Sequence, residues 1–160
     1  PVLAMLCALT RDVLLSSTIE TIVDMPEGTV VPHELFAHVA AARYPDRYSA
    51  ASLRSLGRNI ASSWQQSGHL SGKLRKIRVQ AVCRPNNAVY ALLLGYIQGG
   101  RGESLFHTRW ARVLDATPYR LHEQARSASQ RGWMEYRRSG DVVEIGFRHL
   151  LREFQQGIDT

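Results

Sequence analysis

Cysteine is scarce in this 160-residue chain, which contains only Cys7 and Cys83. Two thiols are too few for a disulfide scaffold, so we expect both to be reduced. Long apolar runs are missing too, because the longest nearly uncharged run, 88–97, is about half of a membrane span. The apolar segment 1–9 has no basic flank, so we expect no signal peptide. These absences exclude secreted and membrane proteins and predict a cytoplasmic one.

The residue patterns typical of enzymes and metal sites are also missing. The six histidines form no His-x-x-x-His pair and have no neighbouring cysteine pair, so the usual zinc spacing is absent. The glycine-rich segment 99–102 lacks the Lys-Ser/Thr ending of a phosphate loop and is better explained as a helix end. Glu34 and His38 lie one helical turn apart, where an exposed surface pair is the simpler interpretation. The sequence therefore predicts a protein without catalytic activity, metal or cofactor.

Acidic residues are nearly absent from the middle of the chain. The net charge is +6, from 20 Lys and Arg against 14 Asp and Glu. Residues 1–42 carry −4 and residues 85–160 carry +2, whereas residues 43–84 hold nine bases and one acid, Asp46. This basic block favours a polyanionic partner, nucleic acid first. The alternative is a generally basic solvated surface, because 18 of the 20 bases are arginine, as a GC-rich genome would produce.

What the chain does contain is a series of helical patterns interrupted by short β-prone segments. Hydrophobic residues make up 44% and charged residues 21%, as in globular domains. Apolar spacing, glycine, proline and capping residues place the elements. They predict helices over 2–23, 32–42, 49–67, 88–98, 103–114, 118–131 and 149–156, a β-prone triplet at 29–31, a strand over 76–81 and a hairpin over 133–147.

The order of these elements predicts the fold. Two helices joined by a tight turn and followed by a β-ribbon make a winged helix-turn-helix, and this order occurs twice. We therefore predict a mainly α fold with a minor β part, made of two winged-helix-like units packed together. The first, 1–86, would bind DNA, and the second would span 87–160.

The helix predicted over 49–67, for which Ser49 is the expected N-cap, points to DNA most directly. At 100° per residue, one face gathers apolar and small residues, Leu53, Leu56, Gly57, Ile60, Ala61 and Trp64. The opposite arc has no acid. Arginine suits guanine, asparagine and glutamine suit adenine, and serine suits either a base or a phosphate. The candidate DNA-binding residues of this helix are Ser52, Arg54, Ser55, Arg58, Asn59, Ser62, Gln65 and Gln66. The alternative is an outer face that packs on a partner protein.

A basic segment follows this helix directly. Alternation predicts that Lys76 and Arg78 share the polar side of the strand, while Ile77 and Val79 face the core. Such bases would contact phosphates beside the groove and set the register without reading sequence. The candidate phosphate contacts are Lys73, Arg75, Lys76 and Arg78.

The helix predicted over 118–131 gives a weaker signal. Its inward residues are Leu121, Ala125 and Ala128, and the residues expected to face outward are His122, Glu123, Arg126, Ser127, Ser129 and Gln130. Glu123 would repel phosphate. Arg126 on the helix and Arg137 and Arg138 in the hairpin are the candidate DNA contacts here, with Arg120 and Arg131 flanking them. A unit used for packing or dimerisation is the alternative, because a fold does not carry its function with it.

The segments 53–64, 76–81 and 132–147, together with Gly68, resemble the winged helix-turn-helix superfamily. In addition, the segments 8–15, 52–60, 67–70 and 131–133 (ALTRDVLL, SLRSLGRNI, SGHL and RGW) are similar to the BrxA family, the small DNA-binding component of BREX phage-defence systems. The resemblance implies an intracellular protein without catalytic chemistry that binds double-stranded DNA and takes part in antiviral defence.

The sequence thus predicts a non-enzymatic double-stranded DNA-binding protein of a bacterial phage-defence or regulatory system, with no membrane or small-molecule partner. One alternative is a protein-interaction module that assembles a larger complex. Another is RNA binding, which is less favoured because Tyr44, Tyr48 and Trp64 are the only aromatic residues of the basic block and stacking requires exposed rings.

Overall fold

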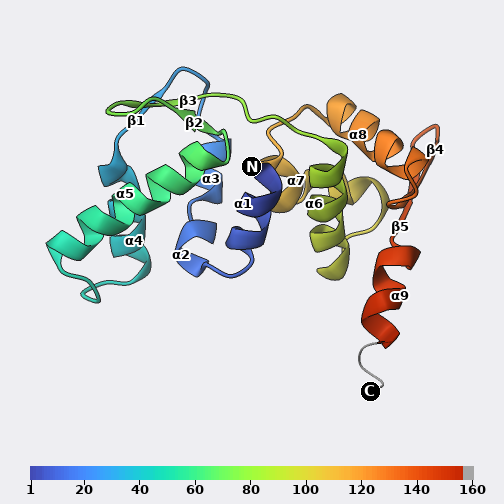
Figure 1. Ribbon diagram of the computed structural model, residues 1–160, viewed down its shortest axis with the longest axis horizontal. Helices are drawn as coiled ribbons and strands as arrows, with labels where there is room; N and C mark the ends of the chain where they lie inside the picture. The colour runs from blue at the N-terminus through green and yellow to red at the C-terminus, as the bar shows by residue number, and fades with distance from the viewer. Residues whose placement is uncertain (157–160) are drawn as a thin grey trace. The chain divides into compact units, whose positions relative to one another are not determined.

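The computed structural model describes the backbone of residues 1–156 and the side chains of residues 1–152. The chain divides into two compact units, Pro1–Val82 and Cys83–Thr160, coloured blue to green and green to red in Figure 1. Helices predominate and the strands are short, so the mainly α fold with a minor β part is confirmed. Among the described residues, no single helix is long and apolar enough to cross a membrane.

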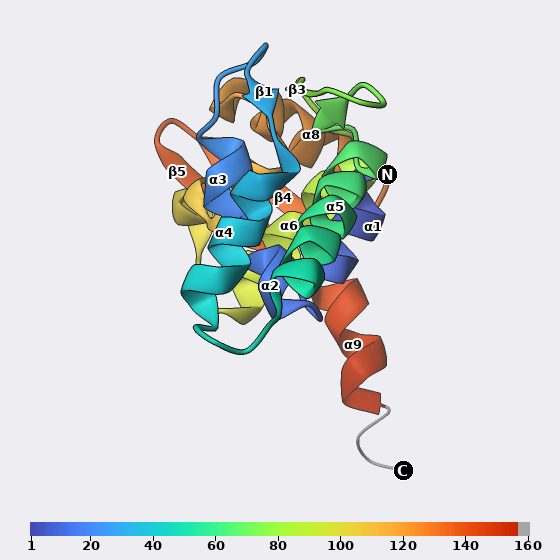
Figure 2. The ribbon, with the colours of Figure 1, turned by 90° about the vertical axis from the view of Figure 1, so that its left-hand side faces the viewer.

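The first unit starts with three short helices, α1 (Val2–Leu9), α2 (Val13–Ser16) and α3 (Ile19–Val23). Strand β1 (Val30–Val31) leads into α4 (His33–Arg43), and a turn joins α4 to α5 (Ala50–Gln66). Strands β2 (Leu70–Ser71) and β3 (Lys76–Arg78) complete an antiparallel sheet of order β1-β3-β2. Figure 2 shows α4 and α5 side by side, with β1 and β3 near the end of α5.

The single helix predicted over 2–23 is wrong. The chain bends by 109° between α1 and the segment that α2 and α3 form. Asp12 starts a new helix there, because its carboxylate accepts a hydrogen bond from the backbone N–H of Leu15 at 2.9 Å. The hydroxyl groups of Ser17 and Thr18 donate to the carbonyls of Leu14 and Leu15, which interrupts the helix a second time. Apolar spacing alone did not reveal these side-chain hydrogen bonds.

Close packing on α4 positions α5. Phe36 of α4 and Trp64 of α5 are fully buried, and the indole N–H of Trp64 donates to the Thr18 hydroxyl at 2.8 Å. A Cβ atom on Gly57 would lie 2.4 Å from the carbonyl oxygen of His33, so only glycine permits this approach of α5 to the start of α4. The side of α5 opposite Gly57 and Trp64 is therefore held outward.

The second unit also consists of helices and a hairpin. It contains α6 (Pro85–Ile97), the 3-10 helix η1 (Gly102–His107), α7 (Arg109–Val113) and α8 (Pro118–Gln130). Strands β4 (Glu135–Ser139) and β5 (Val142–Gly146) pair antiparallel, and α9 (Arg148–Gln156) follows. The predicted hairpin is confirmed, with Gly140 in its turn at a φ of 56°.

Capping residues explain two differences from the predicted helices of this unit. The helix predicted over 103–114 is split into η1 and α7, because the Thr108 hydroxyl accepts from the Ala111 N–H at 3.3 Å and starts a new helix. The helix predicted to begin at 88 begins at Pro85 instead. Asn87 does not precede that helix but lies in its first turn, where its amide oxygen accepts from the Arg84 N–H at 3.1 Å.

Candidate nucleic-acid interface

The side of helix α5 that was predicted to be buried, from its apolar residues, is buried in the structure. Gly57, Ile60, Ala61 and Trp64 are buried, while Leu53 and Leu56, both in the first half of the helix, are half-buried. The helix begins at Ser49, whose hydroxyl accepts from the Ser52 N–H at 3.2 Å. The capping residue and the buried side were both predictable because each depends on local sequence.

The opposite side of α5 is open to solvent and carries no acid. Neither Arg54 nor Arg58 forms an ion pair with any carboxylate of the described residues. Of the candidate residues on this helix, Gln65 is half-buried and Ser52 is exposed near the cap. The remaining exposed candidates form what we call the α5 face: Arg54, Ser55, Arg58, Asn59, Ser62 and Gln66.

The loop between β2 and β3 adds exposed cations next to this helix. Lys73 and Arg75 are both exposed, as predicted for phosphate contacts. Leu74 between them is 104% exposed, so the tip of the loop touches no other part of the described chain closely enough to cover it. The loop can turn this tightly because Gly72 adopts a φ of 94°, and a Cβ atom there would lie 2.1 Å from the Arg75 carbonyl oxygen.

Lys76 has a different role from the phosphate contact that the sequence suggested. It is half-buried, and its ammonium group donates to the side-chain oxygen of Gln65 and to the carbonyls of Gly72, at 2.9 Å, and Lys73, at 3.2 Å. An ammonium group has three donors, so these three acceptors account for all of them. Lys76 and Gln65 therefore hold the β2–β3 loop against α5.

The prediction that Arg78 lies on the polar side of its strand is wrong. Arg78 is only 2% exposed, and its guanidinium donates to the carbonyls of Ile22, at 2.9 Å, His69, at 3.4 Å, and Val79. It ties β3 to the end of α3 and to the residue before β2. Ile77 and Val79, which were expected to face the core, are only half-buried, so the alternation did not identify the buried side of the strand. Arg78 is not part of the surface.

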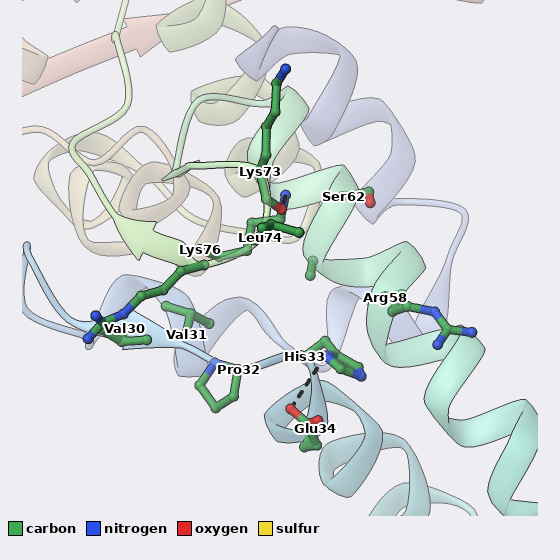
Figure 3. Close-up of a pocket in the computed structure, with 12 residues that line it drawn as sticks. Val30, Val31, Pro32, His33, Glu34, Arg58, Ser62, Lys73, Leu74 and Lys76 are labelled. Atoms are coloured by element: carbon green, nitrogen blue, oxygen red, sulfur yellow. Dashed lines mark hydrogen bonds and ion pairs between the residues drawn. The ribbon is translucent and has the colours of Figure 1, made fainter.

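A hollow of about 510 Å³ lies between α5, the start of α4 and the β2–β3 loop. Arg58 and Ser62 border it from α5, and Lys73, Leu74, Arg75 and Lys76 border it from the loop and β3. Figure 3 shows Arg58 and Ser62 on α5, and His33 and Glu34 at the start of α4, where a dashed line joins the two. Glu34 is the one acid of this lining and lies 3.4 Å from the His33 ring nitrogen. The charged residues of the lining are thus four cations, Arg58, Lys73, Arg75 and Lys76, and one acid, beside apolar residues such as Val30 and Leu74.

The last residue of α4, Arg43, and Arg47 in the turn before α5 are two further cations that sequence reasoning did not select. The Arg47 guanidinium lies 5.1 Å from the centre of the Tyr44 ring and 5.8 Å from that of Tyr48, and Arg43 lies 5.8 Å from Tyr44. Both arginines are exposed, and the half-buried tyrosine rings restrict their positions. Their inclusion in the basic block was the available signal. They extend the cationic surface towards the start of α5.

In the second unit, the three predicted DNA contacts Arg126, Arg137 and Arg138 are exposed. Their surroundings are less cationic than those of α5. Arg120 pairs with Glu123 at 3.1 Å on α8, and the Arg138 side chain donates to the Gly140 carbonyl at 3.2 Å. Exposed arginines therefore remain here, but an acid lies among them.

The prediction that His122 faces outward is wrong. It is 6% exposed, and its two ring nitrogens lie 2.9 Å from the Tyr136 hydroxyl and 3.1 Å from a Glu103 carboxylate oxygen. The Phe106 ring stacks on it at a centroid distance of 3.9 Å. His122 thus connects α8 to β4 and η1. A single sequence gives no signal for such long-range pairing.

No group of three or more His, Cys, Asp or Glu side chains within the described part of the chain is placed to hold a metal ion. Burial raises the pKa of Cys83 to about 11, although Arg120 acts in the opposite direction, so this thiol stays protonated at neutral pH.

Comparisons with family models, curated proteins and solved structures gave no match.

Proposed function

We propose that the first unit binds double-stranded DNA, with α5 in the major groove and the β2–β3 loop beside it. The α5 face is the observation that carries this proposal. It lies on a helix of 17 residues, about 25 Å long at 1.5 Å per residue. A solvated helix usually mixes acids with bases to gain opposite-charge pairs. The α5 face instead combines arginine with amide and hydroxyl groups, which suit base edges and phosphates.

The elements around α5 support this assignment. Helix α4 precedes α5 through a short turn, and the strands β2 and β3 follow it. This is the order of a winged helix-turn-helix, in which the second helix of the pair enters the major groove. The exposed cations Lys73 and Arg75 follow α5 closely, where they would contact phosphates and fix the orientation of the protein.

Binding of a random 30-base-pair duplex, measured by fluorescence anisotropy at two ionic strengths, tests the proposal. If Arg54, Arg58, Lys73 and Arg75 each displace a counterion, affinity should fall about 100-fold between 50 and 200 mM salt. We expect Arg58→Glu to weaken binding at least tenfold, about 1.4 kcal/mol or more. Arg11→Glu is the matched control, because Arg11 is also an exposed arginine of the first unit but lies away from α5 in the sequence.

Three outcomes contradict the proposal. A protein-interaction module would leave the duplex unbound at both salt concentrations. An RNA-binding protein would be competed away by single-stranded RNA more effectively than by duplex DNA. Equal affinities of Arg58→Glu and Arg11→Glu would remove α5 from the interface. Circular dichroism of both variants checks that the fold is kept.

A role in bacterial phage defence or gene regulation is the wider part of the proposal. Its support is the resemblance of the segments 8–15, 52–60, 67–70 and 131–133 to the BrxA family. Deleting the gene from its host should raise the plating efficiency of phage. Unchanged plating would remove the defence role and leave DNA binding unaffected.

A further inference from the structure

The exposed surface of α5 has two sides that differ in their surroundings. Arg58 and Ser62 border the hollow beside the β2–β3 loop, and Gln65 bonds Lys76 from the same direction. We call Arg58 and Ser62, together with the loop residues Lys73 and Arg75 that border the same hollow, the loop side. Ser55, Gln66 and Asn59 lie about 20°, 40° and 60° beyond Ser62 around the helix at 100° per residue, and none of them borders the hollow. We call these three residues the open side.

The loop side gathers positive charge from two elements. Arg58 on α5 and Lys73 and Arg75 in the loop border one hollow, and none of them pairs with a carboxylate of the described residues. Val30 and Leu74 add apolar surface to the same lining. A chain of sugars and phosphates presents alternating apolar and anionic groups, and cations hold such a backbone whatever its sequence. The loop side therefore fits a nucleic-acid backbone.

The open side has a different chemistry because it carries no charge. Asn59 and Gln66 are exposed, and their amide groups form no side-chain hydrogen bond within the described residues. An amide side chain can pair with N6 and N7 of adenine through two hydrogen bonds, and each good pair contributes about 1–3 kcal/mol of discrimination. Without a cation, the same residues add little to sequence-independent affinity. The open side therefore fits base edges.

Resting on the proposed function, we infer a division of contacts: the two sides of α5 bind different parts of a DNA duplex. The loop side holds one sugar–phosphate strand without regard to sequence, and the open side reads base edges in the major groove, favouring adenine through Asn59 and Gln66. The hydrogen bond from Lys76 to Gln65 joins the β2–β3 loop to α5, so both elements border the same hollow.

Glu34 limits where the strand can lie. Its carboxylate borders the hollow from the α4 side and repels phosphate, although His33 lies 3.4 Å away. The backbone strand therefore lies nearer to the loop than to α4. Glu34→Gln should tighten the binding of every duplex by a similar factor, about two- to fivefold, because one repulsive charge is removed without any change at the open side.

Two double variants of the full chain test this division. In each case the protein selects from a randomised duplex library, and its affinity for a random duplex is measured separately. Lys73→Ala/Arg75→Ala should weaken binding to all duplexes about equally, flatten the salt dependence by about two charges and leave the selected motif unchanged. Asn59→Ala/Gln66→Ala should keep the affinity for a random duplex within about threefold and lose the adenine preference.

The outcomes separate this inference from the function on which it rests. If the wild-type protein binds no duplex, the proposed function fails and the inference fails with it. If the wild-type protein binds duplex with steep salt dependence but enriches no motif, the division is overturned while DNA binding stands. The same holds if Asn59→Ala/Gln66→Ala enriches the wild-type motif, or if Lys73→Ala/Arg75→Ala changes it. Both double variants alter only exposed side chains, and circular dichroism checks their fold.

Discussion

Helices α5 and α8 occupy equivalent places in the two units, yet they present different surfaces. Each follows a turn that contains an aspartate with positive φ, Asp46 at 58° and Asp115 at 54°. Each begins at a hydroxyl residue, Ser49 or Thr117, that accepts a hydrogen bond from the N–H three residues later. Each is followed by an antiparallel pair of strands. The local framework is therefore the same in both units.

The surfaces differ because α8 uses its polar residues within its own unit. Glu123 pairs with Arg120, and His122 turns inward to Glu103 and Tyr136. On α5, the corresponding outward side keeps Arg54 and Arg58 without an acidic partner in the described residues. Helices with similar surroundings thus differ in what their outward residues can do. Arginines without an acidic partner are available to bind an anion, whereas polar residues that pair within their unit mainly contribute to its stability.

The largest expected effect concerns the buried cation of the first unit. Arg78→Met removes the donors that satisfy the carbonyls of Ile22 and His69, and it should lower the free energy of unfolding by about 3 kcal/mol. Arg75→Met is the matched control, since this exposed side chain should change stability by less than about 0.5 kcal/mol. Urea unfolding followed by circular dichroism measures both. Equal stabilities of the two variants would show that Arg78 does not hold β3 in place.

The second unit should respond in the same way, but less strongly, at His122. His122→Leu leaves the Tyr136 hydroxyl and Glu103 without their shared partner and should cost about 2 kcal/mol. His149→Leu, at an exposed position of the same unit, serves as the control. Duplex affinity of the folded variant should stay at the wild-type value, because α5 is untouched. A stable His122→Leu protein with altered DNA binding would overturn this separation of roles.

The smallest of these effects comes from giving α5 the charge pairing of α8. Ser62→Glu places a carboxylate four residues after Arg58, within reach of an ion pair. Duplex affinity should fall about tenfold, or 1.4 kcal/mol, because the added acid both neutralises the arginine and repels phosphate. Ser62→Gln keeps the size without the charge and should bind like the wild-type protein. If Ser62→Glu bound DNA unchanged, the lack of acid on α5 would have no bearing on binding.

Local patterns predicted much of the framework. The Ser49 cap, the buried side of α5, the hairpin with Gly140 and the mainly α composition all follow from residues within one or two helical turns. The same local reasoning missed the break after α1, because the carboxylate of Asp12 and the hydroxyls of Ser17 and Thr18 compete with a continuous helix.

The candidate site was predicted only in part. The exposure of Arg54, Arg58, Asn59 and Ser62 follows from the helical period, so it could be derived from sequence. The inward positions of Arg78 and His122 could not, because their partners lie up to 56 residues away in the chain. The role of Lys76 as a support for the loop depends on Gln65, eleven residues earlier, and on two loop carbonyls.

The sequence by itself determined that α5 would be a helix with one apolar and one acid-free side, since both properties depend on residue order and a period of 3.6. Only the tertiary structure decided which polar side chains remain available to a partner. Arg78 and His122 are buried, each in its own unit, because they bond partners in distant segments. Lys76 bonds Gln65 and supports the loop. Arg58, Lys73 and Arg75 remain exposed and border one hollow. The physical reason is that a polar donor or acceptor is costly to bury without a hydrogen-bond partner. Buried polar side chains are therefore placed where groups from distant segments can bond them.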